Sequence, residues 1–212
     1  MARETAETVA RLPVDMAGFV FAESRRRVEP RLAGELVGIL RDAGSRALAA
    51  GVFVDADFAA VAETIGTAGL QIVQLHGRET PDYCHKIKEA FPEVRIFKVF
   101  APPEQATADA VRRQLDPYLG RLDAVMLDTA GGGTGRTFDW ERIPVYRRWA
   151  DDAGLPLIVA GGLNPGNVES LIERYRPDGV DVSSGVETDG KKDPQKIIAF
   201  IERVKTIDRQ RT

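Results

Sequence analysis

Short apolar runs alternate with amphipathic stretches along almost the whole chain. The apolar runs are rich in Val, Ile, Leu and Phe, and they cover residues 16–21, 47–54, 70–75, 94–100, 124–127, 155–160 and 179–182. Near-continuous apolar runs of this length are typical of strands that are buried on both faces. They therefore predict a parallel β-sheet covered by helices.

The amphipathic stretches between these runs have helical spacing of apolar residues. The predicted helices cover residues 2–12, 30–42, 57–68, 81–91, 104–115, 140–150, 164–175 and 194–205. Regular alternation of strand and helix favours βα repeats.

Two architectures fit such repeats, a closed barrel and an open doubly wound sheet. No G-x-G-x-x-G motif follows the first strand, and the strongest glycine-rich turns come late in the chain. TIM barrels frequently bind phosphate at the loops after their last two strands. We therefore predict an α/β fold, a TIM (β/α)8 barrel that forms a single domain over residues 1–212. Because the chain opens on a helix, it carries about seven strands where a closed barrel needs eight, so the barrel is N-terminally truncated.

Composition narrows the function classes. The chain has 29 basic and 32 acidic residues, a net charge of −3, and no basic stripe that would bind nucleic acid. It has no apolar run of about 18 residues and no apolar segment near the N-terminus, so neither a membrane span nor a signal peptide is expected. With one cysteine, Cys84, it forms no internal disulfide, and we expect a cytoplasmic protein.

Two late turns are suited to binding phosphate. The run ending near residue 160 is followed by Gly161 and Gly162, and Asn164 is predicted to begin the next helix as its N-cap. The run 179–182 is followed by Ser184 and Gly185. Each turn alone is more typical of a tight connection. On adjacent barrel loops, however, their backbone N–H groups would face a common anion, so together they predict a phosphate cradle.

Two further polar residues end predicted strands. Asp128 follows the run 124–127 and precedes a glycine-rich stretch, residues 131–135, that we interpret as an active-site loop. A carboxylate at the carboxyl end of a barrel strand points into the catalytic mouth, so we interpret Asp128 as catalytic. His76 ends the run 70–75, where a ligand-binding role and a structural role fit equally well, and Gln74 is suited to a polar layer inside the barrel. His85 is expected on a solvated helix face, and Cys84 as a partly buried residue of the same outer helix.

These residues resemble those of phosphoribosylanthranilate isomerase, an enzyme of tryptophan biosynthesis, over essentially the whole chain. The matching segments are residues 18–21, 24–28, 51–54, 73–77, 127–128, 132–135, 138–140, 160–168, 179–187 and 191–194. The resemblance implies a TIM barrel that converts N-(5-phosphoribosyl)anthranilate into 1-(2-carboxyphenylamino)-1-deoxyribulose 5-phosphate. This Amadori rearrangement uses neither a metal nor a cofactor, and its partner is a small phosphoribosyl substrate.

The resemblance also implies roles for individual residues. A general acid of the family protonates the furanose ring oxygen, and an arginine meets the anthranilate carboxylate, a pairing that suits a guanidinium. The site residues expected here are Asp128 as the catalytic acid, Arg26, His76 and Asp181 for the substrate, and Gly162, Ser184 and Gly185 for the phosphate.

One feature of the family has no counterpart in these 212 residues. The family opens on a strand reading Lys-Ile-Cys-Gly, whose cysteine is the general base, and the match begins just after that strand. Cys84, on an outer helix, would not reach the mouth. We therefore expect the 212 residues to catalyse poorly or not at all. A late start codon and a true truncation, or pseudoenzyme, both explain this pattern.

Loss of the strand would also expose sheet edges at residues 16–21 and 179–182, through which oligomers could form.

Two other functions stay open. A related isomerase of phosphorylated aminoaldoses would show a second phosphate turn in the first half of the chain, where no Gly-Gly turn occurs. A non-catalytic phosphate-ligand binder, or a fragment that needs a partner segment, would bind the substrate without turnover.

Overall fold

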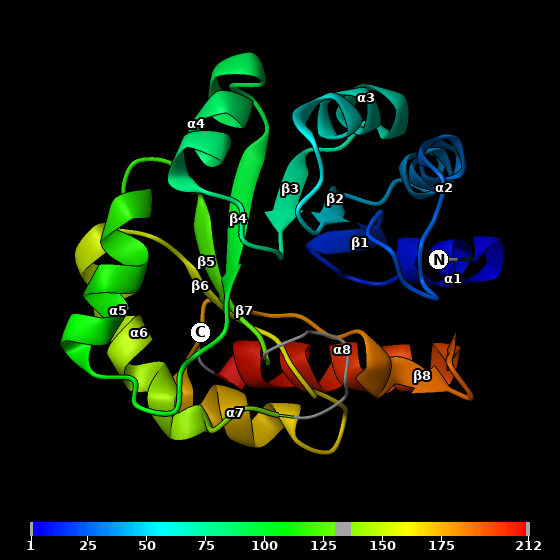
Figure 1. Cartoon of the computed structure of the whole chain (residues 1–212). Helices are drawn as coiled ribbons and strands as arrows, with labels where there is room; N and C mark the ends of the chain where they lie inside the picture. Colours follow the sequence, from blue (N-terminus) through cyan, green and yellow to red (C-terminus); the bar gives the residue numbers. More distant parts are fainter. Residues whose placement is uncertain (1, 130–136, 211–212) are drawn as a thin grey trace. The chain divides into compact units, whose positions relative to one another are not determined.

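The computed structural model describes residues 2–129 and 137–210 (Figure 1). The chain divides into two compact units, Met1–Lys98 and Val99–Thr212. Strand β4 (Arg95–Phe100) crosses the boundary between them. The single domain expected over residues 1–212 stays a prediction.

The first unit alternates helices and parallel strands after an initial helix. Its elements are α1 (Arg3–Ala10), β1 (Met16–Val20), α2 (Pro30–Asp42), β2 (Leu48–Phe53), α3 (Phe58–Ala68), β3 (Ile72–Leu75), α4 (Pro81–Ala90) and β4. Strand β1 pairs with β2, β2 with β3, and β3 with β4, all in parallel. Parallel neighbours place the carboxyl ends of these strands along one edge of the sheet.

Local sequence explains these elements. Helix α2 buries Ala33, Leu36, Val37 and Leu40, a spacing that puts one apolar stripe against the rest of the unit. Helix α3 begins where the Asp57 carboxylate accepts a hydrogen bond from the Ala60 amide at 2.8 Å. It ends at Gly69, whose φ of 66° is in the left-handed region that favours glycine. All four residues of β3 are buried, as its unbroken apolar run predicts.

The second unit continues the alternation and ends in a small hairpin. Its elements are α5 (Ala108–Leu115), η1 (Asp116–Tyr118), β5 (Ala124–Leu127), η2 (Trp140–Arg142), α6 (Ile143–Ala153), β6 (Leu157–Val159), α7 (Val168–Tyr175), β7 (Gly179–Val180), η3 (Ser184–Val186), β8 (Glu187–Thr188), β9 (Lys191–Lys192) and α8 (Pro194–Gln210). Strands β5, β6 and β7 are parallel neighbours, whereas β8 and β9 pair in an antiparallel hairpin that the apolar pattern did not predict.

The expected start of the helix after β6 is wrong. Asn164 is not the N-cap of α7, because that helix begins at Val168 with Asn167 in the N-cap position. The Asn164 side chain instead accepts a hydrogen bond from the Gly166 amide at 2.8 Å, and the Asn164 amide donates to Asn167 Oδ1 at 2.8 Å. A short amide side chain often bonds the backbone two residues on, which closes a turn before the helix.

Two strands have one neighbour each among the described strands. Strand β1 pairs with β2, apart from an isolated bridge between Val20 and Arg27, and β7 pairs with β6. Oligomer formation through these edges stays a prediction. Of the helices in the described ranges, none is long and apolar enough to cross a membrane.

Candidate functional site

The carboxyl end of β5 carries Asp128, as the sequence predicts. The side chain is buried, with 6% of the residue exposed. Its Oδ1 accepts hydrogen bonds from the Thr129 amide at 2.6 Å and from the Thr129 hydroxyl at 3.0 Å. Both bonds restrain the plane of the carboxyl group, so the acid is held in one orientation.

Gly161 explains how the end of β6 approaches this acid. Its φ is +86°, and a Cβ atom at this position would lie 2.7 Å from Asp128 Oδ1 and 2.9 Å from the Thr129 hydroxyl. A residue with a side chain would therefore displace the acid. Gly161 therefore allows β6 to approach Asp128 closely, in addition to the role of the glycine pair in the turn that follows.

The two turns proposed to bind phosphate are in direct contact. A Cβ atom on Gly185 would lie 1.7 Å from the Leu163 carbonyl oxygen, so η3 packs backbone to backbone on the β6–α7 loop. In that loop the Gly162 carbonyl accepts hydrogen bonds from Asn167 Nδ2 at 3.0 Å and Asn164 Nδ2 at 3.3 Å. The structure therefore brings Gly162, Ser184 and Gly185 together in neighbouring loops.

A lysine of the hairpin supports the second of these loops. Lys192 Nζ donates to the Ser183 carbonyl at 2.8 Å and lies 3.3 Å from Glu187 Oε1. The lysine side chain is 24% exposed and the glutamate side chain 5% exposed.

Asp181, just after β7, is exposed, and its amide donates to the Val159 carbonyl at 2.9 Å.

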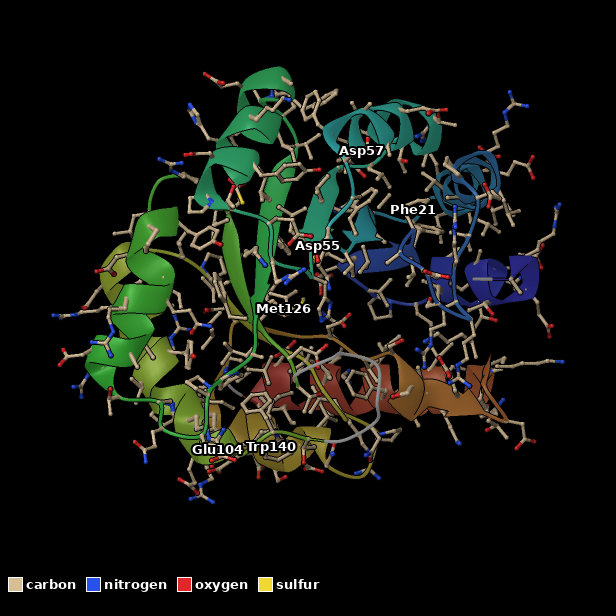
Figure 2. The ribbon with its side chains drawn as sticks, in the orientation of Figure 1. Phe21, Asp55, Asp57, Glu104, Met126 and Trp140 are labelled. Carbon is tan, nitrogen blue, oxygen red and sulfur yellow. The ribbon has the colours of Figure 1, made fainter. Side chains whose placement is uncertain are left out.

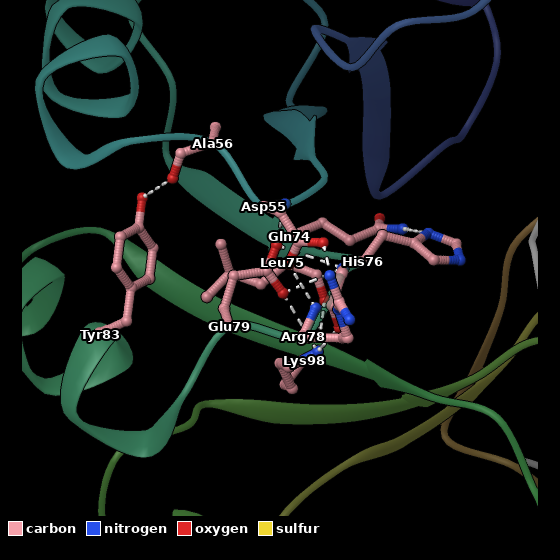
Figure 3. A network of polar contacts seen from close by, with 10 residues as sticks. Asp55, Ala56, Gln74, Leu75, His76, Arg78, Glu79, Tyr83 and Lys98 are labelled. Carbon is pink, nitrogen blue, oxygen red and sulfur yellow. Dashed lines mark hydrogen bonds and ion pairs between the residues drawn. The ribbon is translucent and has the colours of Figure 1, made fainter.

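In the first unit, His76 directly follows β3. Its amide donates to the Phe53 carbonyl at 2.8 Å, and its Nδ1 lies 3.4 Å from Gln74 Nε2 (Figure 3). The His76 residue is half-buried, and Gln74 is 8% exposed.

A buried ion pair lies beside His76 that the sequence reasoning missed. Lys98 Nζ on β4 is 3.2 Å from Glu79 Oε2, and the two side chains are 3% and 2% exposed. Tyr83 on α4 donates its hydroxyl to the Ala56 carbonyl at 2.8 Å (Figure 3). Burial, followed by the Glu79 and Asp57 carboxylates, raises the pKa of Tyr83 to about 12. The available signal was Lys98, a charged residue between Phe97 and Val99 in the interior of the apolar strand β4.

Arg26 lies in the loop after β1. Its amide donates to Ser24 Oγ at 3.1 Å, and the residue is half-buried between two exposed arginines, Arg25 and Arg27. Phe21, at the start of this loop (Figure 2), stacks on Phe53 with ring centroids 5.2 Å apart. Arg26 and His76 therefore both follow strands of the first unit.

The remaining expectations have mixed outcomes. Cys84 is fully buried rather than partly buried, because it shares the packed face of α4 with Ile87. His85 is exposed as expected, and its Nε2 lies 3.3 Å from a carboxylate oxygen of Glu89. The glycine-rich stretch 131–135 lies outside the described residues. Within the described ranges no group of three or more His, Cys, Asp or Glu residues is arranged to hold a metal ion.

Comparison with known proteins connects this geometry to one family. The model of the N-(5'phosphoribosyl)anthranilate (PRA) isomerase family matches residues 2–203. The isomerase of Brevibacillus brevis is 39% identical over 206 residues, which cover 95% of this chain and 89% of that protein. A solved structure of the isomerase from Pyrococcus furiosus is 31% identical, with a TM-score of 0.77 and coverage of 96% of this chain and 94% of that one.

A further solved structure holds a ligand. It is a phosphoribosyl anthranilate isomerase in complex with reduced 1-(o-carboxyphenylamino)-1-deoxyribulose 5-phosphate (rCdRP). It is 33% identical, with a TM-score of 0.75 and coverage of 96% of this chain and 92% of that one. These likenesses confirm the predicted TIM-barrel class, represented in the described residues by the parallel strands β1–β7. The chain belongs to the PRA isomerase family.

Proposed function

We propose that this chain isomerises N-(5-phosphoribosyl)anthranilate to 1-(2-carboxyphenylamino)-1-deoxyribulose 5-phosphate, a step of tryptophan biosynthesis. Membership of the PRA isomerase family makes the protein an isomerase. The observation that carries the proposal is the family match over residues 2–203, with a buried acid at the end of β5 inside it.

Asp128 is the general acid in this proposal. Opening of the furanose ring needs a proton on the ring oxygen, and a carboxylic acid at the end of a barrel strand is suited to deliver it. The two hydrogen bonds from Thr129 and the close approach of Gly161 hold the carboxyl group ready for that transfer. A fixed donor loses less freedom when the reaction begins.

The phosphate group binds at Gly162, Ser184 and Gly185. Glycine backbones allow N–H groups to approach an anion closely, and a serine hydroxyl adds a donor. The contact between Gly185 and Leu163 keeps the two loops together. Lys192 donates to the Ser183 carbonyl and so supports the same turn, and its ion pair with Glu187 holds the ammonium in place.

Arg26, His76 and Asp181 bind the rest of the substrate. Arg26 offers a guanidinium for the anthranilate carboxylate, a charge pair that also favours a fixed geometry. His76 offers an imidazole at the end of β3, and Asp181 offers a carboxylate at the end of β7.

Cys84 is not the general base that removes the C2′ proton. It is fully buried on α4, and it is the one cysteine of the 212 residues. A general base contributes about 10²–10⁴-fold to rate. The 212-residue polypeptide by itself is therefore expected to bind substrate well and to turn it over slowly.

Asp128→Asn tests the catalytic assignment. In the 212 residues extended by a Lys-Ile-Cys-Gly-containing first strand, we expect this change to lower kcat by about 10²–10⁴-fold, because the amide donates no acidic proton. Affinity for rCdRP should change little. Asp152→Asn, an exposed aspartate of α6, is the matched control and should leave kcat unchanged.

Two outcomes decide between the functions, and a third tests the role of Asp128. Slow turnover that the added strand accelerates supports an isomerase with the missing base. Binding of rCdRP without turnover, even in the extended chain, would favour a non-catalytic binder. A variant Asp128→Asn that keeps full kcat would remove Asp128 from the mechanism.

A further inference from the structure

The buried pair Glu79–Lys98 contacts the backbone on both sides of His76. Lys98 Nζ donates to the Leu75 carbonyl at 3.3 Å and to the Gly77 carbonyl at 2.8 Å, the residues before and after the histidine. Its third N–H is directed to Glu79 Oε2 at 3.2 Å. An ammonium has three donors, and three acceptors lie within reach of it here.

Glu79 holds the same segment from the acceptor side. Its Oε2 accepts from the Gly77 amide at 2.9 Å, and its Oε1 accepts from the Asp55 amide at 2.9 Å. The carboxylate therefore ties the β3–α4 loop, which contains Gly77, to the β2–α3 loop, which contains Asp55 (Figure 3).

Asp55 completes this link at the cost of backbone strain. Its φ is +48°, a conformation that non-glycine residues adopt rarely, and its Oδ1 accepts from the Arg78 amide at 2.6 Å. A Cβ atom on Gly77 would lie 2.5 Å from the same oxygen. The loops are packed too closely at this point for any residue larger than glycine.

Stability alone is a weak reason for such a pair. Burying two charges costs desolvation energy that their attraction often fails to exceed, and apolar residues of the same volume are frequently as stable. This pair lies at the carboxyl ends of the strands, where barrels place function. The strained backbone and the buried charges at that end indicate that the pair fixes the positions of the loops after β2 and β3.

We propose that Glu79 and Lys98 are positioning residues that hold the Leu75–Gly77 backbone so that the His76 imidazole keeps one orientation toward the substrate. The proposal rests on the assignment of His76 to substrate binding made above. Neither Glu79 nor Lys98 touches the substrate in this scheme, and both act through the histidine.

The two histidines of the chain provide a direct readout. Ring ¹⁵N–¹H spectra of histidine-labelled protein report on His76, while the exposed His85 serves as an internal reference. The test variant is Glu79→Gln with Lys98→Met, which removes both charges at similar volume and leaves no unpaired ion. Arg78→Ala is the matched control in the same loop: its side chain is 95% exposed, so its 3.7 Å ion pair with Asp55 is solvated, and the Arg78 amide that bonds Asp55 is kept.

In the double variant we expect the His76 ring signals to shift toward those of a solvated imidazole, with His85 unchanged. Affinity for rCdRP should fall by up to about 10²-fold, since a displacement of about 1 Å can cost that much. In turnover assays KM should rise more than kcat falls. Arg78→Ala should leave both the spectrum and the affinity as they are.

The variant His76→Gln distinguishes the positioning role of Glu79 and Lys98 from the assignment of His76 to substrate binding. If the pair acts through His76, His76→Gln weakens rCdRP binding in the parent protein and adds little in the double variant. If His76→Gln leaves affinity unchanged in the parent, the assignment of His76 to binding fails, whatever the spectrum shows.

Unchanged His76 signals in the folded double variant would overturn the positioning role, as would fully additive losses of affinity. If the double variant does not fold, Lys98→Arg provides the second test, because a planar guanidinium does not reproduce the three contacts of one ammonium. A shifted His76 signal in folded Lys98→Arg would support the proposal. Failure of both variants to fold would make the pair a requirement of the fold and overturn it.

Discussion

The two units hold their strand-end loops in different ways. In the first unit, Glu79 and Lys98 come from different elements and are buried to 2–3% exposure, and they tie the loops after β2 and β3 to strand β4. In the second unit, Glu187 and Lys192 belong to one short hairpin, and the lysine is 24% exposed. There the loops meet mainly through glycine, where Gly161 approaches Asp128 and Gly185 approaches Leu163.

The two units therefore show two ways to hold a loop in place at the end of a strand. A loop that must present a side chain such as His76 is fixed by long-range charged contacts, which are strong when buried and satisfied. A loop that must present backbone N–H groups, as proposed for the phosphate turns, needs close backbone approach, which glycine permits. The comparison predicts that charge removal harms the first unit most and added side chains harm the second.

The largest expected effect is that of Lys98→Met on stability. It leaves the Glu79 carboxylate buried without its ammonium, so the free energy of unfolding should fall by about 3–5 kcal/mol. Lys192→Met, the matched change in the second unit, should cost about 1 kcal/mol or less because its ion pair is partly solvated. Urea unfolding measures both. Equal losses would erase the contrast between the two pairs.

The next effect concerns Gly185→Ala. Its methyl group would overlap the Leu163 carbonyl, and overpacking of this kind costs about 1–3 kcal/mol of stability. The phosphate turns should separate, and losing one hydrogen bond to a charged group, worth about 1.5–3 kcal/mol, weakens rCdRP binding by about 10–10²-fold. Gly18→Ala is the control, since a Cβ atom there meets nothing within 4 Å. Identical affinities for the two variants would refute the close-approach role.

A smaller effect is expected at alkaline pH. Two tyrosines have a pKa raised by burial to about 12, Tyr83 in the first unit and Tyr146 in the second. The unfolded chain loses these protons near pH 10, so their contribution to stability is present below pH 10 and is lost as the pH rises to about 12. Unfolding titrations between pH 9 and about 12 measure the decline.

Salt sharpens this comparison between the two tyrosines. The Glu79 and Asp57 carboxylates add to the raised pKa of Tyr83, whereas Arg142 opposes the raised pKa of Tyr146. Screening should therefore lower the pKa of Tyr83 and leave that of Tyr146 unchanged or higher. Tyr83→Phe should also cost about 1 kcal/mol at neutral pH through the lost hydrogen bond to Ala56. The reverse salt trends would contradict this electrostatic account.

Local pattern predicted most of the fold. Each of the described strands β1–β7 lies within an apolar run, and the initial helix α1 lies within the amphipathic stretch 2–12. The hairpin β8–β9 escaped prediction because its two-residue strands have no apolar alternation to detect. Asn164 was misjudged because its side chain and that of Asn167 both bond within the loop 162–167, which closes a turn that delays the start of α7 to Val168.

The candidate site was predicted in part. Asp128 directly follows β5, and Gly162 and Gly185 lie in the loops after β6 and β7, so their places could be read from the periodicity of the strands. Glu79 and Lys98 are 19 residues apart, and their pairing arises only when β4 folds beside β3, so no local pattern reveals it. Burial of Cys84 likewise depends on which face of α4 meets the sheet.

Calorimetric titration of the 212-residue chain with rCdRP tests the central claim most directly, that the residues assigned to substrate and phosphate binding hold a phosphoribosyl ligand. We predict one-to-one binding that His76→Gln in the first unit and Gly185→Ala in the second each weaken by about 10–10²-fold. Gly18→Ala should leave the affinity unchanged. Absence of binding, or an affinity that is insensitive to the change in either unit, would contradict the account.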